Sequence, residues 1–181
     1  MKILIATPIY PPEIGAPASY VKELAKRLVE NHEVTIVVYG RLPEKVPGVS
    51  FVCINKQKPL LIRLLHFVSV FLKEAKKVDI IYAENGASVE LPLSVVSLFV
   101  KKPVIFHIGD KLADEKTKNS QLQKRIKDFV QKRARKVLTG APPERPEILP
   151  FDPVPQSEFD ACESSWTKHI NTLEDLFKNA K

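Results

Sequence analysis

The chain has 181 residues, of which 44% are hydrophobic and 27% charged, a composition that suits one globular domain and excludes fibrous and intrinsically disordered classes. Its net charge of +7 at neutral pH favours anionic partners such as phosphorylated substrates, anionic lipid or nucleic acid. Nucleic acid is the least supported of these, because no aromatic RNA-binding signature, zinc-ligand spacing or helix-turn-helix pattern accompanies the charge.

The first predicted unit, residues 2–27, is a buried strand followed by a turn and an amphipathic helix. Residues 3–6 are continuously apolar, as in a parallel strand covered on both faces. Gly15 can take a positive φ in the turn, and Pro17 suits the first turn of a helix. Such a loop presents backbone N–H groups to a phosphate, a carboxylate or a sugar hydroxyl. The alternative is a tight connection without a ligand.

Further strands and helices alternate along the chain. Strands are predicted at residues 32–40, 49–55, 79–85, 102–109 and 136–140, and helices at 60–77, 88–100 and 121–135. Ser88 is the expected cap of the second of these helices, with Pro92 in its first turn, and a polar stretch fills 111–120. This alternation predicts an α/β, Rossmann-like doubly wound parallel sheet of about six strands in the order 3-2-1-4-5-6.

Two basic segments each have two interpretations. Residues 60–77 form an apolar helix that is shorter than the roughly 20 residues needed to span a bilayer. It either packs on the sheet or lies in a membrane interface with Arg63 and three lysines at the headgroups. Residues 118–136 carry eight cationic residues against Asp128 alone. They form either a solvated helix face or a landing surface for anionic lipid or a partner.

Five segments carry a more specific signal than their periodicity. They read TPIYPPEIGAPASYVKELAKRL, HEVTIVVYG, DIIYAEN, KPVIFHIGD and ARKVLTG. In order and spacing they resemble the N-terminal domain of glycosyltransferase family 4, which has the GT-B fold. A final helix, capped by Ser164 or Ser165 and carrying Trp166, is similar to the family's last helix, which packs back on that domain. The resemblance implies an acceptor-side domain at 1–140, a Pro-rich linker at 141–163, a helix at 164–181 and no donor-binding domain.

The resemblance also implies site residues. His107 and Asp110 would be catalytic, and the substrate would be bound by Gly15, Ala16, Ser19, Tyr20, Glu84, Asn85 and Gly109. His107 would accept a proton from an acceptor hydroxyl or hold a donor hydroxyl, and Asp110 would orient His107 or contact the sugar. Each residue also has a structural alternative. His107 would be hydrogen-bonded to backbone, Asp110 would cap the next segment of the chain, and Glu84 and Asn85 would stabilise the turn after their strand. The family usually carries a second glycine where this chain has Ala16.

Taken together, the resemblance implies transfer of a sugar from a nucleotide sugar to an acceptor, with no cofactor or metal. One half of the cleft should turn over little alone, so a donor-binding subunit or self-association is expected. The alternative is a non-catalytic binding or scaffold protein. A nicotinamide or methyl-donor enzyme would need a glycine fingerprint that the chain lacks. The two cysteines, Cys53 and Cys162, favour a cytoplasmic location, with peripheral membrane contact through the basic segments.

Overall fold

A computed structural model describes residues 1–40, 42–118, 120–139, 146, 148 and 153–180. Within these residues the strands form one six-stranded sheet in which every neighbouring pair is parallel. The strands are β1 (Lys2–Thr7), β2 (Glu33–Tyr39), β3 (Val49–Ile54), β4 (Ile80–Glu84), β5 (Val104–Ile108) and β6 (Lys136–Thr139). Their order, β3-β2-β1-β4-β5-β6, confirms the predicted doubly wound topology.

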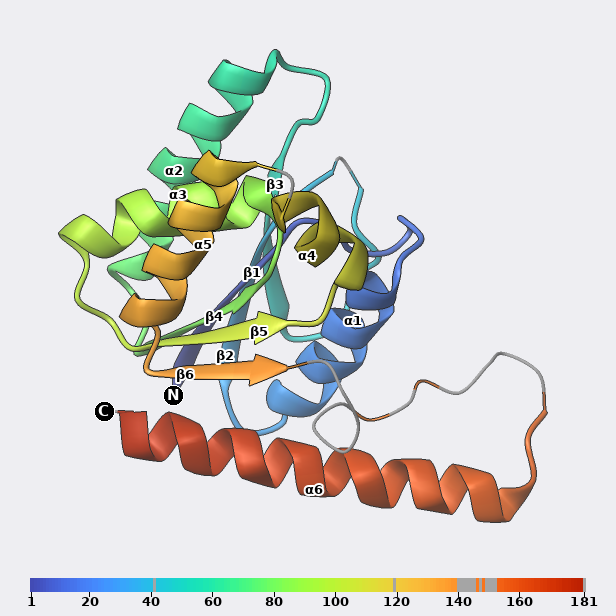
Figure 1. Ribbon diagram of the computed structural model, residues 1–181. Coiled ribbons are helices and arrows are strands. Elements are labelled where there is room, and N and C mark those ends of the chain that lie inside the picture. The colour runs from blue at the N-terminus through green and yellow to red at the C-terminus, as the bar shows by residue number, and fades with distance from the viewer. Residues whose placement is uncertain (41, 119, 140–145, 147, 149–152, 181) are drawn as a thin grey trace.

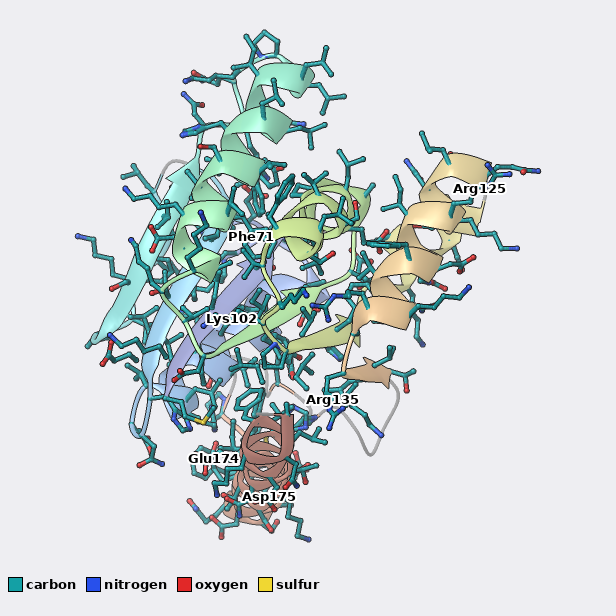
Figure 2. All side chains as sticks on the ribbon, turned by 90° about the vertical axis from the view of Figure 1, so that its left-hand side faces the viewer. Phe71, Lys102, Arg125, Arg135, Glu174 and Asp175 are labelled. Atoms are coloured by element: carbon teal, nitrogen blue, oxygen red, sulfur yellow. The ribbon has the colours of Figure 1, made fainter. Side chains whose placement is uncertain are left out.

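The helices cover both faces of the sheet (Figure 1). They are α1 (Ala16–Leu28), α2 (Leu60–Ala75), α3 (Ala87–Phe99), α4 (Lys111–Lys118), α5 (Gln121–Arg133) and α6 (Gln156–Ala180). Because side chains alternate along a strand, Ile3 and Ile5 pack with α1 and α6, whereas Leu4 and Ala6 pack with α2, α3 and α5. Figure 2 views α6 nearly end-on, on the opposite side of the sheet from α2 and α5. The two apolar cores explain why the central strands are apolar on both faces.

The long helix α6 packs back on the domain, as predicted. Trp166, Ile170, Leu173 and Phe177 recur at helical spacing and are all buried in the core shared with α1. The guanidinium of Arg27 on α1 lies 4.6 Å from the centre of the Trp166 ring. These contacts hold the end of the chain against its beginning, and the two termini lie near each other in Figure 1.

Several predicted helix boundaries are wrong. The N-cap of α3 is Gly86, with a φ of +139° that a side chain would strain, so Ser88 lies inside the helix and Pro92 is beyond its first turn. Residues 111–118, predicted as a polar stretch without structure, form α4 because Asp110 caps it.

At the two chain ends, local signals also misled the prediction. The helix α6 begins at Gln156 rather than at Ser164 or Ser165, whose hydroxyl side chains tolerate a helix interior. Gly15 has a φ of 162°, which is extended backbone that any residue adopts, so the predicted positive φ is also wrong. Of the segment 141–163 predicted as a Pro-rich linker, residues 156–163 belong to α6, and residues 141–145, 147 and 149–152 lie outside the described residues. The division into domains stays a prediction.

Candidate functional site

A buried acid–histidine pair lies where β4 and β5 end. Glu84 and His107 are opposite each other in the register of the two strands, and both face the α1 and α6 side of the sheet. Oε1 of Glu84 lies 2.8 Å from Nδ1 of His107, and the exposed fractions of the two side chains are 0% and 1%. An ionised carboxylate can only accept, so Nδ1–H donates to it, and in the neutral form of the imidazole the lone pair is then on Nε2. We call Glu84 and His107 the dyad.

The second polar atom of each dyad residue lacks a partner. Among the described residues, neither Oε2 of Glu84 nor Nε2 of His107 makes a hydrogen bond, although both atoms are buried. A buried polar atom without a partner costs stability, about 1–3 kcal/mol in mutational data. Such atoms are therefore more common where a ligand or a chemical step requires them than in an ordinary core.

Aromatic side chains from three elements surround the dyad. The Tyr20 ring on α1 lies 4.9 Å from the His107 ring, centre to centre, and the Tyr82 ring on β4 lies 6.0 Å away. The Tyr20 hydroxyl is 3.0 Å from that of Tyr82 and 2.7 Å from Nε2 of His169 on α6. The ring of Trp166 stacks on Tyr20 at 5.6 Å. The last helix of the chain therefore forms one wall around the dyad.

Gly109 closes the dyad from the loop side. A Cβ atom added there would lie 2.7 Å from Cε1 of His107 and 3.1 Å from Oε2 of Glu84. A separation of 2.7 Å is essentially never seen for a real Cβ atom, so a side chain at 109 would force either the loop between β5 and α4 or the His107 ring to shift. The glycine predicted to bind substrate therefore has a clear packing role beside the dyad.

Asn85 and Asp110 have satisfied scaffold bonds in the same loop region. The Asn85 amide donates to the carbonyl of Asp110 at 2.8 Å and accepts from the Asp110 N–H at 2.8 Å. Oδ1 of Asp110 accepts from the N–H groups of Leu112 and Ala113, which is the capping role weighed as its structural alternative. These bonds fix the loops after β4 and β5 relative to each other.

The residues predicted at the start of α1 are less closely grouped. Ser19 is exposed, whereas Tyr20 is fully buried and turned towards His107. The carbonyl of Gly15 accepts from the N–H groups of Ala18 and Ser19. Ala16 is the first residue of α1, and its side chain lies outside the part of the structure that is described. The structure thus brings Tyr20, Glu84, His107 and Gly109 together.

The sequence did not identify Tyr82 and His169 as parts of this site. Tyr82 lies two residues before Glu84, so strand alternation alone places it on the same face, a signal that was available. His169 lies on α6, and only the return of that helix brings it to Tyr20. Sequence spacing could not show that contact, because 149 residues separate the two.

A second buried acid, Glu90, lies behind the turn between β4 and α3. Its Oε1 atom accepts from the N–H of Gly86 at 3.1 Å, and its side chain is 1% exposed. Burial raises the pKa of Glu90 above its usual range, which is only partly offset by the bond to Gly86. This acid stands on the other side of the sheet from the dyad, in the first turn of α3.

The edge of the sheet where the dyad lies carries exposed apolar side chains. Ile14 before α1, Leu42 after β2 and Leu112 in α4 have exposed fractions of 100%, 84% and 70%. The start of α2 adds a further exposed group, which consists of Leu60, Leu61, Ile62 and Leu65. Each of these segments follows the carboxyl end of a strand, which is where open α/β sheets bind ligands. Exposed apolar groups of this kind mark interaction surfaces.

No family model and no curated protein matches the chain. Among solved structures, HepE from Anabaena, determined in complex with UDP and glucose, matches with a TM-score of 0.55 and 21% identity over 76% of this chain and 37% of HepE. A Listeria monocytogenes structure named as a UDP-N-acetylglucosamine 2-epimerase matches with a TM-score of 0.52 and 13% identity, over 76% of this chain and 38% of that one. The chain therefore shares its fold with part of each of these two structures, and it spans little more than a third of their length.

Proposed function

We propose that the chain is the acceptor-side half of a glycosyltransferase that resembles family 4 and that works with a donor-binding domain or subunit. The observation that carries this proposal is the dyad, an imidazole held by a carboxylate at the carboxyl ends of parallel strands, with an Nε2 atom that has no hydrogen-bond partner among the described residues. The fold shared with nucleotide-sugar proteins supports it. The donor would be a nucleotide sugar, bound as a substrate rather than as a cofactor.

In this proposal the dyad acts on a sugar or acceptor hydroxyl. In one role, Nε2 of His107 accepts the proton of the acceptor hydroxyl while the hydroxyl oxygen bonds to the anomeric carbon of the donor sugar and the nucleoside diphosphate leaves. In the other role, Nε2 holds a hydroxyl group of the donor sugar. Glu84 fixes the tautomer and stabilises the imidazolium, as the aspartate of a catalytic triad does. Because His107 is 1% exposed, the loop that contains Gly109 must move before a hydroxyl reaches Nε2.

A second half would be needed for turnover. Positioning of the donor and stabilisation of the leaving diphosphate would come from the other wall of the cleft. The exposed Ile14, Leu42 and Leu112 at the strand ends support a partner there, because isolated domains seldom leave such groups uncovered beside a site. Self-association of the chain is the other way to complete the cleft.

We also propose contact with an anionic membrane at the start of α2. Leu60, Leu61, Ile62 and Leu65 are more than half exposed, and Arg63 lies among them. None of the helices described here is long and apolar enough to cross a bilayer. Contact would therefore be peripheral, with the basic residues of 118–136 adding attraction to acidic headgroups.

One observation favours a second candidate function, that of a binding or scaffold protein without catalysis. Both dyad residues are fully enclosed, and Asp110 is occupied as a helix cap. An acid–histidine pair of this kind also serves to hold two strand ends together. In that case substitution of His107 lowers stability and leaves ligand binding unchanged.

A thermal-shift and turnover screen against nucleotide sugars tests the proposal, with the chain alone and with His107→Ala, Glu84→Gln and His66→Ala beside it. His66 is exposed on α2 and serves as the matched histidine control. Stabilisation by one donor, or donor hydrolysis that is lost only in the two dyad variants, supports the transferase. A flat response in every protein, repeated with acceptor sugars, contradicts a working site in the isolated chain and leaves either a half that needs its donor-binding partner or the scaffold.

A further inference from the structure

An apolar groove lies between α3 and α5, on the other side of the sheet from the dyad. It has a volume of about 290 Å³ and is lined by Ser94, Val95, Leu98, Arg125, Ile126 and Phe129. Leu98 and Phe129 remain 66% and 40% exposed, and Leu122, one turn before Ile126, is 67% exposed. The two helices pack directly on each other beneath these side chains. The groove is thus a shallow, open apolar surface that no described part of the chain covers.

The α5 side of this groove is cationic. Arg125, Lys132 and Arg133 lie at helical spacing with Ile126 and Phe129, and none of the three forms an ion pair with a described residue. The only acid of α5, Asp128, lines a different pocket on the α4 side, together with Lys124 and Lys127. Figure 2 shows Arg125 on α5, far from α6 and its acidic residues Glu174 and Asp175.

The α3 side of the groove carries no charge. Its outward residues Leu91, Ser94, Val95 and Leu98 are apolar or hydroxylic, and the one acid of the helix, Glu90, is buried under it. The groove therefore combines an apolar floor with cations along one rim. The partner that complements this pattern has an apolar stripe with acidic residues beside it.

We propose that this groove binds an acidic amphipathic helix of a partner protein. Two parallel helices form a channel into which a third helix can place apolar side chains at i, i+3 or i+4 and i+7. A bilayer surface fits the observations less well, because Leu98 and Phe129 line a hollow rather than a protruding face. A second copy of the chain is disfavoured by its net charge of +7. The inference does not depend on the proposed transferase function.

Fluorescence anisotropy with a synthetic peptide tests the inference. The probe is a labelled helical peptide of about 18 residues with leucines at helical spacing and glutamates on both flanks, and the control peptide has glutamine in place of each glutamate. The groove variants are Leu98→Ser and Arg125→Glu. Their matched controls are Leu112→Ser, at a site 70% exposed against 66% for Leu98, and Lys124→Glu, which changes the charge equally on the other flank of α5.

The full chain should bind the acidic peptide with a Kd in the micromolar range and the glutamine peptide about tenfold more weakly. Leu98→Ser and Arg125→Glu should each weaken binding by about tenfold or more, and the two controls by less than about twofold. All four sites are exposed or on the rim, so circular dichroism should be unchanged. If a variant fails to fold, the comparison of the two peptides on the unchanged chain still decides the test.

Three results would overturn the inference. The first is a peptide result: either the acidic peptide does not bind, or Arg125→Glu and Lys124→Glu lose the same amount of peptide affinity. Equal losses in these two variants would indicate general charge attraction. The second is binding to vesicles of phosphatidylglycerol and phosphatidylcholine that only the groove variants lose, without peptide binding, which would identify a membrane surface. The third is a dimer in sedimentation that Arg125→Glu dissociates, which would assign the groove to a second copy of the chain.

Discussion

The substitution Trp166→Ala should detach or loosen α6 and so test how the end of the chain is joined to the site. Trp166 is 1% exposed, stacks on Tyr20 and lies under the Arg27 guanidinium. Replacing a buried tryptophan by alanine costs about 3–5 kcal/mol. Stabilities of whole proteins are about 5–15 kcal/mol, so this loss is a large fraction of the total. At about 2–4 °C per kcal/mol for a chain of this size, Tm should fall by about 6–20 °C.

The matched control is Phe159→Ala on the same helix, because Phe159 is 47% exposed and Phe and Trp have similar helix propensities. Calorimetry should show a loss of less than about 1 kcal/mol for that variant. Hydrogen exchange over residues 156–180 distinguishes local release of α6 from global unfolding. A Trp166→Ala protein that melts no lower than Phe159→Ala, with α6 amides equally protected, would refute the packing of α6 against α1.

Three other variants test the buried acid, the loop glycine and the α2 surface. Burial raises the pKa of Glu90, so the free energy of unfolding falls as pH rises above the usual pKa of a glutamate. Glu90→Gln should remove that fall and raise the free energy of unfolding at pH 8 by about 1 kcal/mol in calorimetry. A lower free energy of unfolding for Glu90→Gln at pH 8 would contradict the raised pKa of Glu90. Gly109→Ala should cost about 1–3 kcal/mol and shift the imidazole NMR signals of His107, and unchanged signals would exclude the clash. Leu61→Ser with Leu65→Ser should weaken binding to phosphatidylglycerol vesicles by about tenfold, whereas equal binding would remove the membrane contact.

The sequence alone determined the class and topology of the fold. Continuous apolar strands such as Ile3 to Ala6, alternating with amphipathic helices, permit a parallel sheet covered on both faces and little else. The strand order 3-2-1-4-5-6, predicted from the Rossmann pattern, is the order of the structure. These features depend on residues close in the chain, and such features can be predicted from a sequence.

Local signals also failed where tertiary contacts or backbone geometry decided the outcome. Ser88 looked like a helix cap, but Gly86 takes the cap position because the chain enters α3 with a φ of +139°. The polar residues 111–118 form a helix because Asp110 caps it and Lys127 pairs with Asp114. Neither result follows from hydrophobic periodicity, the pattern from which the helices and strands are predicted.

The candidate site shows the same division. Glu84 and His107 could be predicted individually, because each lies at the end of a strand predicted from its apolar run. Their contact at 2.8 Å, and the burial that leaves Oε2 and Nε2 without partners, follow from the register of β4 and β5. The hydrogen bond between Tyr20 and His169 exists only because α6 returns across the sheet. A sequence specifies which groups stand at a strand end, whereas the packing of distant segments decides which of them meet and how far water is excluded.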